Sequence, residues 1–139
     1  MIKYAISTVL LLAWSISVSA QQQFEYKLLA TNRTTTMEKE MNEAANEGYR
    51  FKEVISGETA FGGDEALVVM VREVADKHAA RYEYRLLATT KTSTMQKELQ
   101  AAGDAGFEHC GNSVFKKTLG VEVMVILERD REVKPKLWD

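Results

Sequence analysis

The chain contains the same segment twice, and this duplication limits what it can fold into more than any other feature. FEYKLLAT at residues 24–31 returns as YEYRLLAT at residues 82–89. Aligned at an offset of 58, residues 24–49 and 82–107 are identical at 13 of 26 positions. A self-match of this length indicates an internal duplication in which each copy is one supersecondary unit.

The duplicated segment begins with a predicted strand. Residues 24–31 alternate, with Phe24, Tyr26, Leu28 and Ala30 on one face and mostly polar residues on the other. Period-two alternation with aromatic and aliphatic residues is typical of a half-buried strand. We expect these four side chains, and their counterparts in residues 82–89, to point into the core.

A helix follows each of these strands. Residues 35–38 (TTME) fit a capping box, in which the hydroxyl accepts from a free N–H and the acid returns to the cap. Methionine and alanine then recur at helical spacing, which predicts helices at about 36–47 and 94–105. Gly48 and Gly106 stand where a helix commonly ends in a left-handed residue.

Two more predicted strands complete each copy, so the predicted fold class is α+β, with two βαββ repeats in a pseudo-twofold domain. A right-handed crossover makes the first two strands of a copy parallel. We expect the third to insert between them, giving antiparallel sheets with one helix on a face. The third strands are apolar on both faces, so either the sheets pack back to back or the second face binds a partner or ligand. The later strands are expected at residues 49–55, 67–71, 107–115 and 121–127.

The first twenty residues are typical of an export signal. Lys3 supplies a positive charge, an apolar segment runs from Ala5 to Val18, and small residues follow up to Ala20. The apolar segment is short for a membrane-spanning helix, which needs about 20 residues; an uncleaved anchor is the alternative. We expect an exported, periplasmic or secreted protein without stable membrane insertion after cleavage. The predicted divisions are a signal peptide (1–20), a first repeat (21–74), a join (75–81), a second repeat (82–130) and a polar tail (131–139).

Charge and cysteine content exclude several classes of protein. Without residues 1–20 the chain has 17 basic and 20 acidic residues, interspersed, for a net charge of −3. Nothing resembles the basic stripe that a nucleic-acid phosphate backbone requires, so no nucleic-acid partner is expected. The single Cys110 forbids an intramolecular disulfide, so the 119-residue remainder must rely on its hydrophobic core.

The order Tyr-Glu-Tyr-Arg strand (residues 82–85), helix, Gly-aromatic pair and hairpin resembles a family of small bacterial domains of unknown function. In that family a Tyr-Glu-Tyr-Lys strand precedes a helix and a Gly-Trp-Glu step; here Tyr49 and Phe107 replace the tryptophan, and only Glu108 keeps the acid. The resemblance covers nearly all of each copy. It implies the fold, and it implies no catalytic residues.

The Thr-rich segments before the two helices are the best candidate binding sites. Each places hydroxyls and one cation at a helix N-terminus, where free N–H groups and the helix dipole favour an anion. The alternative is that the hydroxyls only cap the helices and the cations are solvated. The candidate residues for an anion or sugar are Arg33, Thr34, Thr35, Lys91, Thr92 and Ser93.

His109 and Cys110 suggest a thiol–imidazole pair, but adjacent strand residues point to opposite faces, which argues against a catalytic dyad. Two histidines and one cysteine are too few and too scattered for a zinc site, so no metal or other cofactor is expected. The sequence favours a non-catalytic binding or interaction module, either monomeric or dimeric. The alternatives are a small-ligand carrier, using the seam between repeats or the helix N-termini, and a thiol-dependent enzyme acting through Cys110.

Overall fold

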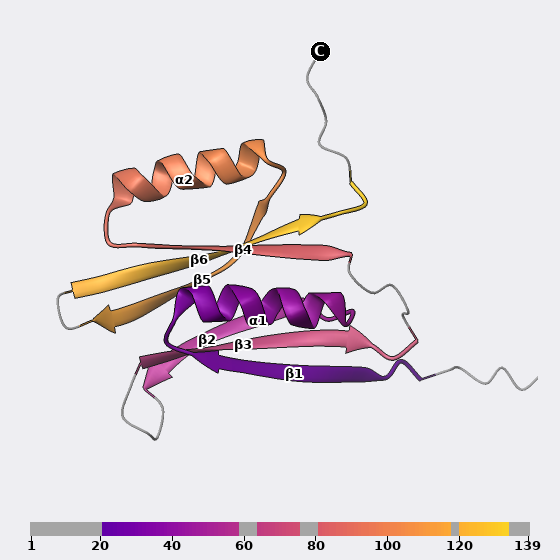
Figure 1. Ribbon diagram of the computed structural model, residues 1–139. Coiled ribbons are helices and arrows are strands. Elements are labelled where there is room, and N and C mark those ends of the chain that lie inside the picture. The colour runs from indigo at the N-terminus through magenta and orange to yellow at the C-terminus, as the bar shows by residue number, and fades with distance from the viewer. Residues whose placement is uncertain (1–20, 59–63, 76–80, 118–119, 134–139) are drawn as a thin grey trace, which may run out of the picture.

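The computed structural model describes residues 21–58, 64–75, 81–117 and 120–133. The predicted signal peptide, residues 76–80 of the predicted join and residues 134–139 of the predicted tail lie outside these ranges. The elements in chain order (Figure 1) are β1 (Phe24–Thr31), α1 (Thr34–Asn46), β2 (Arg50–Glu58), β3 (Asp64–Glu73), β4 (Tyr82–Thr89), α2 (Thr92–Asp104), β5 (Glu108–Lys117) and β6 (Gly120–Asp130).

The fold is α+β and consists of two βαββ repeats, as predicted. Sheet A has the order β1-β3-β2 and sheet B the order β4-β6-β5, so in each repeat the third strand lies between the first two. Both pairings with the third strand are antiparallel, which makes the outer strands parallel to each other. The repeats also share a bulge, because the register of β2 shifts between Phe51 and Glu53 and that of β5 between His109 and Gly111.

Both helices end in a Schellman motif, which explains the repeated Gly-aromatic pair. The N–H of Tyr49 donates to Ala44 O and the N–H of Gly48 donates to Ala45 O, each with an N···O distance of 3.0 Å. Gly48 has φ +92° and Gly106 φ +85°, a left-handed conformation that glycine adopts without strain. The aromatic residue that follows is buried in both repeats, so the helix end and the start of the next strand are fixed together.

The predicted capping box is wrong. Both helices begin two residues earlier than expected, and their N-caps are Arg33 and Lys91, neither of which makes a side-chain capping bond. The Glu38 carboxylate does not return to the helix start, since it accepts the N–H of Leu86 in β4 over 2.8 Å. The Glu38 carboxylate, which the local pattern predicted to cap the helix, therefore binds the other repeat instead.

An arginine of the third strand supports each helix C-terminus in the same way. Arg72 pairs with Glu25 of β1, lies 4.6 Å from the centre of the Tyr49 ring and donates to Glu47 O over 2.7 Å. A cation at this end favours the helix dipole. The second repeat does the same with Arg129, Glu83, Phe107 and Ala105. The repeats thus share topology, register and local motifs.

The helices differ in what surrounds them. Figure 1 shows α1 between the two sheets and α2 on the far side of sheet B. Met37, Met41 and Ala45 of α1 are buried among residues from both sheets, so the two repeats share one core. By contrast, within the described part of the chain α2 packs on sheet B alone, and Ala102 is its buried residue.

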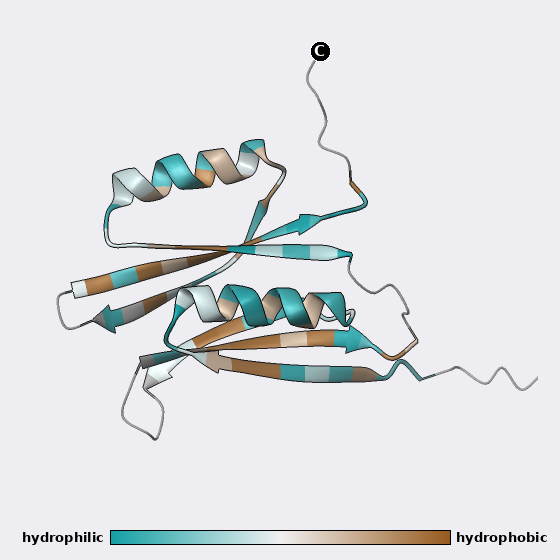
Figure 2. Ribbon diagram, viewed as in Figure 1, coloured by the Kyte–Doolittle hydropathy of each residue, from teal (hydrophilic) through white to brown (hydrophobic). Residues whose placement is uncertain are grey.

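The burial of the middle strands, β3 and β6, follows from this layering. Both strands are largely apolar in Figure 2. In β6 four consecutive residues, Met124 to Leu127, are buried, because a helix covers each face of sheet B. In β3 only alternate residues such as Val68 and Met70 are buried, while Val69 and Val71 on the other face are half-buried. Sheet A therefore has one open face.

The expectation that Phe24, Tyr26 and Leu28 point into the core is wrong for β1. Tyr26 is 64% exposed and Leu28 62%, although their counterparts in β4, Tyr84 and Leu86, are 2% and 7% exposed. The strands have nearly the same sequence, but among the described residues only sheet B has a neighbour against this face. The equivalence of the two repeats does not extend to burial.

Candidate functional site

The predicted binding residues form two separate groups, one at the start of each helix, and both helices begin at the left of Figure 1. In each group a threonine before the helix, Thr31 or Thr89, accepts the N–H of the N-cap residue through its Oγ1, at 3.2 and 3.1 Å. Thr34 is half-buried. The others, Arg33, Thr35, Lys91, Thr92 and Ser93, are exposed. The sites remain predictions.

A cavity of about 190 Å³ lies beside the start of α2. It is lined by Thr89 to Thr92 together with Met95 and Val123. Two of the predicted residues, Lys91 and Thr92, contribute to this lining.

A polar cluster joins the repeats at their seam. The buried Tyr84 hydroxyl donates to Glu128 over 2.7 Å and accepts the backbone N–H of Phe51 over 2.7 Å. Arg50 of β2 donates to both oxygens of the same Glu128 carboxylate, at 2.8 to 3.3 Å. Burial raises the pKa of Tyr84, and the adjacent carboxylate adds to this rise while the Phe51 N–H opposes it. These groups are satisfied by one another, so the cluster fixes the seam and offers no free acid or base.

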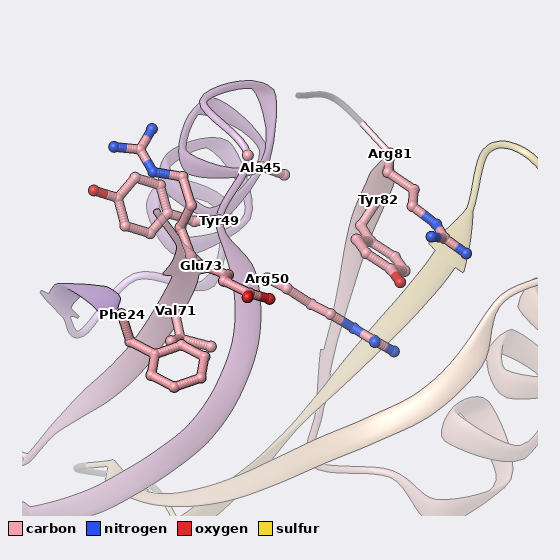
Figure 3. A pocket seen from close by; sticks show the side chains of 10 residues that line it. Phe24, Ala45, Tyr49, Arg50, Val71, Glu73, Arg81 and Tyr82 are labelled. Carbon is pink, nitrogen blue, oxygen red and sulfur yellow. The ribbon is translucent and has the colours of Figure 1, made fainter. Parts of the chain in front are cut away.

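A cavity of about 300 Å³ opens beside this cluster, at the end of the seam (Figure 3). Arg50 extends from the first repeat toward Tyr82 of the second, with the guanidinium carbon 4.3 Å from the ring centre. Arg81 lies on the other side of the cavity and pairs with Asp130 over 2.8 Å. The remaining lining residues are Phe24, Ala45, Gly48, Tyr49, Val71, Arg72 and Glu73. Arginines beside aromatic rings suit an anion or a sugar, although carboxylates already neutralise much of their charge.

Cys110 occupies the bulge in β5, half-buried against the shared core. Its thiol donates to Ile126 O at 3.5 Å. Burial raises its pKa to about 12, the Glu128 carboxylate adds to the rise, and Arg50 opposes it. A thiol must ionise to act as a nucleophile, so this environment disfavours thiol catalysis. His109 next to it is exposed.

The open face of sheet A is the largest difference between the repeats; we call it the outer face of sheet A. Register places one residue from each strand in a row, such as Ala30, Leu67 and Ile55. Its most exposed members are Tyr26 and Leu28. The apolar side chains of this face are Phe24, Tyr26, Leu28, Ala30, Ile55, Leu67, Val69 and Val71. Large contiguous patches of exposed apolar surface are typical of interaction sites in proteins.

Within the described ranges, no group of three or more His, Cys, Asp or Glu side chains could hold a metal ion. Among the same residues, no helix has the length and apolarity needed to span a bilayer.

No family model, curated protein or solved structure matches the chain. Inferences about function therefore rest on the described side chains and their surroundings.

The seam and a second apolar face of the third strands were predicted from the sequence as candidate surfaces. The residues that form them were not predicted, although a signal for these residues was present. In the aligned repeats, Glu128 of β6 stands where β3 has Val71, and Gly111 stands where β2 has Glu53. A charge in an otherwise apolar strand, or a glycine in place of a charge, indicates that one repeat contacts something that the other does not. Both Glu128 and Gly111 face the seam.

Proposed function

We propose that the protein is a non-catalytic interaction module that is exported to the periplasm or secreted and binds a protein partner through the outer face of sheet A. The observation that carries this proposal is the exposure of Tyr26 and Leu28, whose counterparts Tyr84 and Leu86 are buried by a helix and a sheet. The same surface chemistry is thus covered in one repeat and open in the other.

Two further features support a protein partner. The open strand β1 is a sheet edge, which offers unpaired backbone groups next to the apolar side chains. Tyrosine is one of the residue types enriched among the hot spots of protein interfaces, and Tyr26 on this face is 64% exposed. Catalysis has no comparable support, because the buried Tyr84 pairs with the half-buried Glu128 and the pKa of Cys110 is raised.

Site-specific photo-crosslinking in the producing cells tests the proposal. A photoreactive amino acid is placed at Leu28, on the outer face of sheet A, and in a control chain at Ala101, an exposed position of α2. We expect a defined crosslinked species from position 28 and not from position 101, and mass spectrometry then identifies the partner. Position 28 giving no more product than position 101 would contradict the proposal.

A carrier for a small anion or a sugar is the second candidate function. It is supported by the seam cavity of about 300 Å³, at the lower end of the range for ligand pockets, with Arg50 and Arg81 beside the Tyr82 ring. Native mass spectrometry of the protein purified from the exported fraction would reveal a retained ligand. We expect Arg81→Ala to lose it if the cavity binds it, and Arg33→Ala to lose it if the helix N-termini do.

A further inference from the structure

The contact between the repeats runs in one direction only. The first repeat presents α1 and β2, and the second receives them on the face of sheet B that carries Tyr84 and Leu86. The reverse contact, of α2 on sheet A, does not occur among the described residues, and Figure 1 shows α2 and β1 at opposite ends of the molecule. A contact between unlike surfaces is heterologous. Repeated heterologous contacts form a ring if the rotation between units closes, and an open filament if it does not.

Side chains of α1 cap the open edge of β4. The Asn42 amide accepts the N–H of Tyr84 at 3.0 Å and donates to its C=O at 2.9 Å, as a neighbouring strand would. One turn earlier, Glu38 accepts the N–H of Leu86. Ala45, one turn further on, is buried beside these contacts. The helix thus covers both the apolar face and the polar edge of the second repeat.

The same surface exists on α2, where nothing among the described residues covers it. At an offset of 58, Gln96 corresponds to Glu38, Gln100 to Asn42 and Gly103 to Ala45. Gln100 carries the same kind of amide, whose Nε2 donates to Asp104 Oδ1 of the same helix at 2.8 Å, and all three α2 residues are exposed. A Cβ added at Gly103 would meet no atom within 4 Å. The outer surface of α2 is therefore an unoccupied copy of the surface that α1 uses.

The matching receiver is the outer face of sheet A. Val74 N–H donates to Gln23 O, and this register turns the N–H and C=O groups of Tyr26 and Leu28 away from β3. They occupy the places that Tyr84 and Leu86 hold in β4. No side chain from the described ranges caps them.

From these two unpartnered surfaces we infer that the protein self-associates head to tail, with α2 of one copy seated on the outer face of sheet A of the next. This inference rests on the proposed function and names the partner as a second copy of the chain. Gln100 then pairs with the backbone of Tyr26, and Gln96 accepts from Leu28. Where Phe51 lies against Gly111 within the chain, His109 of one copy lies against Glu53 of the next. An imidazole ring thus meets a carboxylate.

The contact between copies is weaker than the one within the chain. The Arg50–Glu128 ion pair of the seam has no counterpart, because Glu108 and Val71 occupy the corresponding positions. We expect reversible assembly that depends on concentration.

Sedimentation equilibrium of the purified protein, as the cell processes it, tests the assembly. The wild type is expected to exceed twice the monomer mass as its concentration rises. Leu28→Glu disables the sheet surface and Gly103→Glu the helix surface, and each should weaken association roughly tenfold or more, since the new charge loses its hydration. Ala101→Glu adds the same charge elsewhere on α2 and should associate like the wild type.

Mixing the two disabled variants is the decisive step. Each keeps one working surface, so an equimolar mixture should form a complex of two chains and stop there. Failure of the mixture to associate, while the wild type does, would overturn the head-to-tail contact in favour of a reciprocal one. A wild type that stays monomeric at all concentrations would also overturn it, yet crosslinking from position 28 to another protein would leave the proposed function standing.

Discussion

The two leucines Leu28 and Leu86 allow the asymmetry of the repeats to be measured as a difference in stability. They lie at equivalent positions of β1 and β4, each followed by Leu-Ala-Thr. Because the local sequence is the same, truncation to alanine changes the unfolded chain almost equally at both sites. The difference between Leu28→Ala and Leu86→Ala therefore reports the folded surroundings.

Burial sets the expected magnitudes. Leu86 is 7% exposed and packs in the shared core, so its truncation leaves a cavity and should cost about 2–5 kcal/mol. Leu28 is 62% exposed. Its truncation removes about a third of the burial, and water fills the space, so the cost should be about 0.5–1 kcal/mol. For a domain of this size, a difference of about 2 kcal/mol separates the two melting temperatures by about 8 °C.

Urea unfolding followed by circular dichroism provides the measurement, with the midpoint and slope fitted for each variant. It is done at a concentration where sedimentation shows monomers, because association would stabilise the native state. Equal destabilisation by the two substitutions would refute the assignment of an open outer face to sheet A.

Three further predictions test the seam and the ion pairs. A Cβ at Gly111 would lie 2.7 Å from Cζ of Phe51, so Gly111→Val should destabilise the protein by about 1–3 kcal/mol, and less in a Phe51→Leu background; additive costs would contradict this contact. Because the pKa of Cys110 is raised to about 12, iodoacetamide at pH 8 should alkylate it much more slowly in native than in urea-unfolded protein, and equal rates would contradict its burial. The hydrogen bond from Arg81 lowers the pKa of Asp130, so this carboxylate stabilises the fold above its unfolded pKa of about 4 and loses that effect as pH falls through the lower folded pKa. Asp130→Asn should therefore lose less stability on acidification than the wild type, as measured by urea midpoints at several pH values.

Gly103 provides the control for the glycine substitution. It lies in α2 with no atom within 4 Å of an added Cβ, so Gly103→Ala should stabilise the helix by about 1 kcal/mol. Opposite signs at Gly103 and Gly111 would separate the effect of packing from that of backbone freedom.

Local patterns predicted the architecture because each pattern occurs in both copies of the repeat. The Gly-aromatic pairs at Gly48 and Gly106 marked the helix ends, and the structure has a left-handed residue at each. The double apolar pattern of the third strands predicted cover on both faces, which β6 has. The parallel direction of the first two strands in each repeat followed from the crossover connection, a rule that needs no long-range information. The insertion of the third strand between them was a separate expectation, which the strand orders confirm.

The error at β1 concerns a contact between the repeats. Alternation in β1 showed which residues share a face, but it could not show that only β4 would have a helix against that face. The sequence at Glu38 fits a capping box, yet this carboxylate accepts a backbone N–H from the other repeat and not one at the helix start. Docking of one repeat on another depends on surfaces far apart in sequence, and local periodicity carries no record of them.

The one-way placement of α1 also bears on the order in which the chain can fold. Synthesis proceeds from the N-terminus, so α1 and its sheet emerge before β4 exists. When the second repeat appears, the surface that must bury Tyr84 and Leu86 is already present to receive them. The reverse order of repeats would expose that apolar strand first, with no helix to cover it. The earlier half of the chain thus supplies the surface on which an apolar strand of the later half is buried.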